Sequence, residues 1–322
     1  MRKYLLSTSA LAGAALISSV AIADVSISGS VEFEYANKDS NIPANDGTIM
    51  GSTNEVTIDF TNKTDSGLTI SYGMDLDGHV GGDVNDNQLS ISGGFGKLVL
   101  GQTDGASDGY SINAQGLIAE ETDGTAASAT ILKDSSGAGI TGNDEKVSYH
   151  LPAMGGLTAG VSYQDTSVAG SDDITEYGFN YAMEAGGAAV TIGYSQATKE
   201  NANQDLDATN IGAKIVTGGI TFTASQATYE ASGEDITGTG FGASYTLPGG
   251  LKLAAVTFKA EDDSAADLGE EYTVNHYEAS YPLASGLTAV LTVSDFDYDN
   301  GAETLSVDEN GTITTLNIKA AF

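Results

Sequence analysis

Carboxylates are the side chains of this sequence with the clearest chemical potential. The chain contains 44 Asp and Glu residues against 12 Lys and Arg, with three histidines and no cysteine. An acidic surplus of this size creates a field that attracts cations and repels anions. Nucleic-acid binding requires a basic surface, and thiolate or disulfide chemistry requires cysteine, so the composition excludes these functions.

The histidines are His79, His150 and His276, and they are the only imidazoles that could act as a general base. A hydrolase also needs a nucleophile within hydrogen-bond reach of that base, and the sequence has no motif for a strained nucleophile. Three scattered histidines are more typical of solvated polar residues than of a reactive centre. We therefore expect no catalytic residues and no metal site.

Acidic loops provide oxygen ligands, which calcium prefers. The stretches "EDDSAADLGEE" and "DGHVGGDVNDN" are of this kind, but "DVNDN" lacks the glycine and the terminal glutamate spacing of a calcium-binding hand. We expect no cofactor, and calcium bound at the acidic loops is the one alternative.

The first 23 residues have the features of an export signal. Arg2 and Lys3 precede an apolar stretch of small residues that closes on Ala21-Ile22-Ala23, which is the pattern of a cleavable signal peptide. A membrane-anchoring helix is the alternative, which the Ser, Thr and Gly content and the cleavage site disfavour. Cleavage would leave a domain over residues 24–322. It would remove two basic residues and no acidic one, so the mature net charge becomes −34 without any arginine.

Strict alternation of apolar and polar residues recurs along residues 24–322 and predicts strands with two different faces. In "DVSISGSVEFEYANK", Val25, Ile27 and Phe33 fall on one face, and serines and glutamates fall on the other. About 16 segments of this kind can be counted. Their connections alternate between short glycine-rich turns and long acidic loops such as 39–52 and 102–144. This asymmetry is typical of outer-membrane barrels.

The alternation in "TITTLNIKAAF" continues to the terminal Phe322. In a membrane barrel every backbone group must be paired, so the last strand must bond to the first. We expect the Phe322 ring in an aromatic girdle at the membrane boundary. A hydrophobic content of 40% fits an apolar outside and an aqueous inside. A β-sandwich or β-helix explains neither the terminal aromatic residue nor the repeated polar face.

Alternation also predicts which charged residues face the lumen. The acids predicted on the first three strands are Glu32, Glu34, Glu55, Asp59, Asp75 and Asp77. The bases predicted to face inward are Lys146, Lys214, Lys259 and Lys319. Because acids outnumber bases on this wall, we expect the lumen to favour cations.

The chain resembles the general porins of Gram-negative outer membranes, most of all their alphaproteobacterial type. The resemblance covers residues 24–322 and rests on four features in order: the signal followed by "DVSISGSVEFEY", the strand pair around "GGFGKLVLGQTDG", the long insertion after it, and the terminal "IKAAF". It implies an all-β, 16-stranded transmembrane antiparallel barrel in the outer membrane, usually a homotrimer, surrounded by lipid and lipopolysaccharide. It also implies that Phe322 belongs to the signal read by the barrel assembly machinery.

The third long connection is by far the longest, and a loop of this length calls for a functional account. The resemblance implies that this loop folds into the lumen and carries acids to a constriction. The matching residues here are Glu120, Glu121 and Asp123, with Asp104 and Asp108 near the root of the loop. On the opposite wall the family commonly has arginines and lysines, whereas this chain has acids.

Passive diffusion of small hydrophilic solutes and ions, with a preference for cations, is the function that these observations favour. A barrel of about 16 strands is wide enough for an aqueous channel. A substrate-selective channel or a surface adhesin on the same barrel is the alternative. An outer-membrane hydrolase is disfavoured by the lack of a nucleophile and base pair, so we expect no enzyme.

Overall fold

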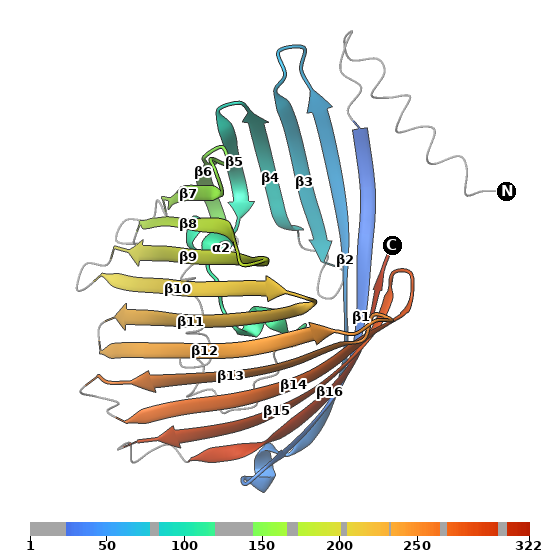
Figure 1. Ribbon diagram of the computed structural model, residues 1–322, viewed down its shortest axis with the longest axis vertical. Coiled ribbons are helices and arrows are strands. Elements are labelled where there is room, and N and C mark those ends of the chain that lie inside the picture. Colours follow the sequence, from blue (N-terminus) through green and yellow to red (C-terminus); the bar gives the residue numbers. More distant parts are fainter. Residues whose placement is uncertain are drawn as a thin grey trace, which may run out of the picture.

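In the computed structural model, sixteen strands form one closed barrel (Figure 1). Each strand pairs antiparallel with its neighbours in the sequence, and β16 pairs with β1. The structure describes residues 24–77, 84–119, 144–165, 173–200, 205–231, 233–264, 269–301 and 308–322. The predicted antiparallel barrel of about 16 strands is confirmed, whereas the predicted signal peptide over residues 1–23 lies outside the described residues.

In the part of the chain that the structure describes, the elements are sixteen strands and three short helices. The strands are β1 (Asp24–Ser40), β2 (Gly47–Lys63), β3 (Thr69–Asp77), β4 (Val84–Gly93), β5 (Gly96–Thr103), β6 (Asp144–His150), β7 (Leu157–Gln164), β8 (Ile174–Ala185), β9 (Ala188–Lys199), β10 (Leu206–Thr217), β11 (Ile220–Ala231), β12 (Glu234–Thr246), β13 (Lys252–Asp262), β14 (Glu270–Ala284), β15 (Leu287–Asn300) and β16 (Glu309–Ala321). The helices are η1 (Pro43–Asn45), α2 (Ala106–Tyr110) and η2 (Gln115–Leu117). None of the helices in the described residues is long and apolar enough to cross a membrane.

Glycine pairs close the short turns at one end of the barrel. Gly186 and Gly187 join β8 to β9 with φ of 62° and 84°, and Gly218 and Gly219 join β10 to β11 with φ of 55° and 83°. Two successive residues with positive φ define the hairpin turn whose twist matches that of the strands, and glycine adopts it without strain. The predicted glycine-rich hairpin turns are therefore confirmed.

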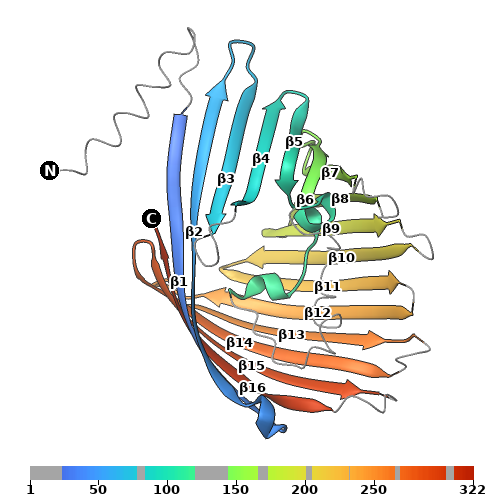
Figure 2. The same ribbon diagram turned by 180° about the vertical axis from the view of Figure 1, so that it is seen from behind.

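The strand register traces two faces around the barrel, because directly opposed residues of antiparallel strands share a face. One face exposes apolar side chains such as Tyr177, Ile211 and Phe241, and we call it the outward face. The other contacts α2 and η2, for example through Glu176 of β8, and we call it the inward face (Figure 2). On β1 the predicted face of Val25, Ile27 and Phe33 is the outward one.

The polarity of the two faces reverses along β13 to β16. Near the short turns the outward face carries Leu253 and Leu291, but near the long connections it carries Lys259 and Asp295 on the same strands. There the inward face is apolar, with a buried cluster of Ala36, Ile236, Phe258, Ala260, Tyr272, Val274, Phe296, Tyr298 and Ile313. Charges are costly against hydrocarbon, so the reversal indicates where the wall leaves the membrane. The predicted polar interior is wrong for this part.

Hydrogen bonds close the seam between β1 and β16 at both ends. At the end near the chain terminus, Phe322 N donates to Gly29 O at 2.9 Å, and Gly29 N donates to Phe322 O at 3.3 Å. The predicted pairing of the last strand with the first therefore includes the last residue.

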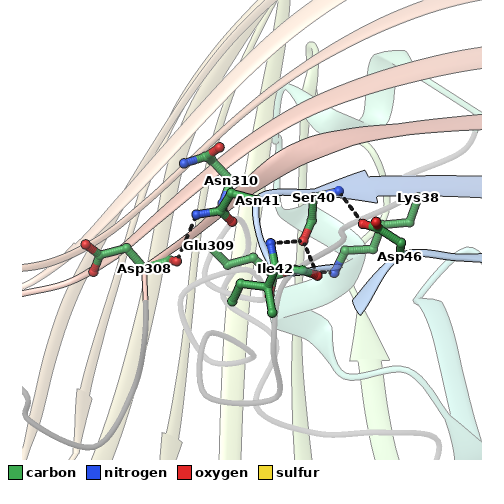
Figure 3. Close-up of polar contacts among 8 residues, drawn as sticks. All are labelled: Lys38, Ser40, Asn41, Ile42, Asp46, Asp308, Glu309 and Asn310. Carbon is green, nitrogen blue, oxygen red and sulfur yellow. Dashed lines mark hydrogen bonds and ion pairs between the residues drawn. The ribbon is translucent and has the colours of Figure 1, made fainter. Parts of the chain in front are cut away.

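At the other end of the seam, Asn41 bonds to the start of β16 (Figure 3). Its amide Nδ2 donates to Asp308 O at 3.3 Å, and Asn310 N donates to Asn41 Oδ1 at 3.0 Å. Beside it, Lys38 Nζ lies 2.7 Å from Glu309 Oε1. The predicted loop 39–52 is wrong in length, because β1 and β2 extend to Ser40 and from Gly47.

Candidate functional site in the barrel lumen

A row of carboxylates occupies the inward face of β1 to β3. The register places Glu55 opposite Asp77, Thr57 opposite Asp75, and Ser30 opposite Glu55. Like charges on directly opposed residues repel, so this cluster is stable only where water or counter-ions reach it. All six acids predicted for this wall share the inward face, namely Glu32, Glu34, Glu55, Asp59, Asp75 and Asp77.

Lysines on the inward face are held by neighbouring groups. Lys146 is buried and donates through Nζ to Thr103 O at 3.1 Å. Lys319 Nζ lies 3.3 Å from Glu32 Oε2. Lys214 also lies on the inward face, at an exposed position of β10. These three bases are on the face that alternation predicts for them.

Lys259 corrects the sequence prediction, because it lies on the outward face. Its Nζ is 2.6 Å from Glu261 and 2.9 Å from Glu271, and both pairs are exposed. Alternation gives two faces but does not say which is inward, and β13 has apolar residues on both. The inward face of this strand contains Val256 and Phe258 instead.

Five further bases lie on the inward face and were not predicted from the sequence. They are Lys38, Lys63, Lys97, Lys199 and Lys252. Lys252 Nζ donates to Leu117 O at 2.5 Å. Neighbouring residues of a strand point to opposite faces, but because both faces of β13 carry apolar residues, no local signal places Lys252 inward.

The third long connection begins with residues 104–119, which we call the loop segment. Its backbone is anchored to inward-facing side chains of β7, β8 and β10. Ala106 N donates to Ser162 Oγ at 2.9 Å, Ser107 N to Glu176 Oε2 at 3.0 Å, and Ile112 N to Asn210 Oδ1 at 3.1 Å. Glu176 and Asn210 are fully buried beneath the segment. Neither anchor was predicted from the sequence.

The far end of the loop segment reaches β13, β14 and β16. Ala119 N donates to Glu278 Oε2 at 2.6 Å, and Lys319 Nζ donates to Ala119 O at 3.2 Å. Lys319 therefore joins the segment to Glu32 of the acidic row. The predicted constriction acids Glu120, Glu121 and Asp123 lie outside the described residues, so their role and the path of the whole connection through the lumen stay predictions.

Asp104 and Asp108 lie where the loop segment leaves β5. Both side chains are exposed within the lumen. The surrounding wall raises the pKa of Asp108 above its ordinary value of 3.8, chiefly by desolvation and then through repulsion from Asp104 and Glu176, while Lys146 opposes the shift. Asp108 therefore takes up a proton, and loses its negative charge, at a higher pH than an ordinary aspartate does.

The two described histidines hydrogen-bond to neighbouring side chains, His150 to the loop segment and His276 within the barrel wall. His150 Nδ1 lies 3.0 Å from Tyr110 Oη, and His276 Nδ1 lies 2.8 Å from Ser294 Oγ. His276 is fully buried in the wall. His79 lies outside the described residues. Within the described part of the chain, no group of three or more His, Asp or Glu side chains is placed to hold a metal ion.

A closed barrel with an apolar outward band and an acidic inward row defines an outer-membrane channel. The family model for Gram-negative porins matches residues 7–301, and the chain belongs to this family. Membership places the protein in the bacterial outer membrane. The more specific alphaproteobacterial type stays a prediction.

Solved porin and channel structures share the fold at low sequence identity. OmpT of Vibrio cholerae is 14% identical, with a TM-score of 0.68 over 95% of this chain and 99% of that chain. An anion-selective porin from Comamonas acidovorans is 16% identical, with a TM-score of 0.67 over 93% and 100%. The outer membrane channel DcaP of Acinetobacter baumannii is 13% identical, with a TM-score of 0.63 over 93% and 97%. The comparison with curated protein sequences gave no match.

Proposed function

We propose that this channel carries small hydrophilic solutes and ions by passive diffusion, makes or breaks no bond in them, and prefers cations. The observation that carries the proposal is the acidic row on the inward face of β1 to β3. Lys146 and Lys252 of the same face donate to backbone carbonyls, and Lys319 lies against Glu32. On the inward face of β1 to β3 the six acids of the row outnumber the two lysines, Lys38 and Lys63, so this wall is net negative and concentrates cations in a narrow aqueous passage.

We further propose that the third long connection forms the constriction. Support comes from the anchoring of residues 106–119 to inward-facing groups from β7 to β16. A backbone fixed at both ends of this span reduces the open cross-section of a barrel. Glu120, Glu121 and Asp123 follow directly after the anchored segment and would add charge there.

Selectivity does not follow from the fold. The Comamonas acidovorans porin of the same fold is anion-selective, and at 16% identity its lumen charges need not resemble these. One similar OmpT structure is described as a trimer, which favours a homotrimer here. Contacts with lipopolysaccharide and with the assembly machinery are part of the proposal, and calcium at the acidic loops is the alternative to a channel without a cofactor.

The first prediction concerns the zero-current potential of the purified channel in a planar bilayer with a tenfold KCl gradient. The sign should show cation preference, and higher salt should weaken it because screening shortens the range of the wall charges. The triple variant E34Q/E55Q/D59N should lose much of this potential.

The matched control is E261Q/E271Q/D295N, which removes the same number of charges from the outward face and should stay close to the wild type. Anion preference in the wild type would overturn the proposed selectivity. Flux that saturates with one solute in liposomes would support the substrate-selective channel instead.

A further inference from the structure

On the inward face of β7 to β12, several neighbouring positions are glycines and therefore carry no side chain. In the register, Gly160 opposes Gly178, Gly193 opposes Gly212, and Ser225 of β11 opposes both Gly212 and Gly240. Gly242 lies two residues further along β12. The six glycines thus follow a path across the wall from β7 to β12, which is interrupted by Ser225 of β11. They are Gly160, Gly178, Gly193, Gly212, Gly240 and Gly242.

The loop segment lies directly on this path of glycines. A Cβ built on Gly178 would come within 2.6 Å of Tyr110 Cβ, and one on Gly212 within 2.3 Å of Ile112 O. Further along the segment, a Cβ on Gly240 would meet Ala114 Cβ at 3.0 Å. A Cβ contact under 3.0 Å requires either the strand or the loop segment to move. The alternate residues of the segment therefore fill the space that side chains on these strands would take.

Backbone conformation does not explain these glycines. None of the six is among the glycines with positive φ, which in the described residues lie at turns and strand ends and, at Gly101, inside β5. Glycine inside a strand weakens it through the entropy of the unfolded chain and the missing side-chain packing. Glycine on five of six successive strands at matching heights therefore indicates the close approach of another backbone.

We infer that the six glycines form a seat that sets how far the loop segment projects into the lumen, and so sets the cross-section of the pore. This inference rests on the proposed channel function. The hydrogen bonds to Ser162, Glu176 and Asn210 hold the segment in place, while the glycines fix its distance from the wall. A methyl group on the seat has to lift the segment toward the centre of the pore.

The test compares G212A with G51A. Gly212 faces a backbone oxygen of the segment. Gly51 also lies on the inward face, in β2, but a Cβ built on it would have no atom within 4 Å. Both changes add one methyl group to an inward strand position. The seat predicts a loss of single-channel conductance in G212A and wild-type conductance in G51A. Equal conductance of folded G212A and G51A channels overturns it.

A second readout does not depend on conduction. The chain has no cysteine, and Ala114 is 1% exposed, so A114C provides a single thiol beneath the segment. A water-soluble thiol reagent should label A114C slowly alone and faster in A114C/G212A, with no acceleration in A114C/G51A. If the wild type forms no pores but labelling follows this order, the proposed function fails and the seat stands. Equal labelling rates overturn the seat.

If G212A fails to fold, G193A replaces it. The Cβ of this variant would meet the side chain of Ile112 at 2.9 Å and the flexible amide of Asn180 at 2.4 Å, not the backbone of the segment. G193A should lower the conductance, and G193A/I112A should recover it, because the shortened side chain frees the space. A double variant with conductance no higher than that of G193A would show that the two residues are not coupled, contrary to the seat.

Discussion

Asp108 shows how the lumen alters a single carboxylate. Its side chain reaches water, yet the barrel wall around it and the nearby carboxylates of Asp104 and Glu176 raise its pKa. An aspartate with a raised pKa takes up its proton at higher pH than usual as the solution is acidified. Because the protonated form carries no charge, acidification removes this group from the field of the pore before it removes ordinary surface aspartates.

We therefore expect the cation preference to begin to fall at a higher pH in the wild type than in D108N. Above the raised pKa the wild type has one more negative charge at the root of the loop. As the pH falls through that pKa this difference in charge disappears, and the zero-current potentials of the two channels become equal. The measurement is the zero-current potential at a series of mildly acidic pH values. D297N, on the outward face, is the control, and a parallel offset at every pH would contradict the assignment.

The seam between β1 and β16 is the element on which closure of the barrel depends. Glu309 is fully buried, Lys38 is largely buried, and the ammonium of Lys38 also lies 5.1 Å from the centre of the Phe296 ring. Removing one partner of a buried ion pair leaves an uncompensated charge, which costs about 3–5 kcal/mol. The Lys259 pairs on the outward face are exposed, and such pairs contribute roughly 0–1 kcal/mol.

K38M should therefore unfold at a clearly lower urea concentration than the wild type, while K259M should unfold close to it. Both variants replace a lysine of the same barrel wall by an uncharged side chain of similar length. Unfolding is followed by far-UV circular dichroism, which reports the loss of strand structure. Equal midpoints for K38M and K259M would show that the seam does not depend on this ion pair.

For the whole molecule, the chain terminus combines two separable features. The backbone of Phe322 is paired with Gly29, whereas its ring is 82% exposed. The backbone bonds complete the closed ladder that a membrane barrel requires. The ring makes no comparable contribution to packing in the monomer, so its proposed role is in assembly.

F322S keeps the backbone bonds and removes the ring. We expect fewer folded barrels in the outer membrane, with unchanged conductance in those that form. The fraction of chains that migrate as the compact form on a gel before heating measures assembly. F33S, which removes another outward aromatic residue away from the terminus, is the control. Assembly of F322S at the level of the wild type would contradict an assembly role for the ring.

The sequence alone determined the barrel, because the features that specify it are local. Period-two alternation, paired glycines at turns such as Gly186-Gly187, and a strand that continues to Phe322 are each visible within a short stretch. The same local alternation placed the six acids of β1 to β3 on one face. These strands are apolar on only one face, so the outward side is unambiguous.

Only the tertiary structure decided which face of β13 is inward and what lies on the wall. Alternation defines two faces but not the medium that each meets, and that medium changes along the strand, so Lys259 lies outside and Phe258 inside. The contact between Ser107 and Glu176 joins residues 69 positions apart. No local pattern reports such a pair, because it forms only when the closed barrel brings the glycine seat beneath the loop segment.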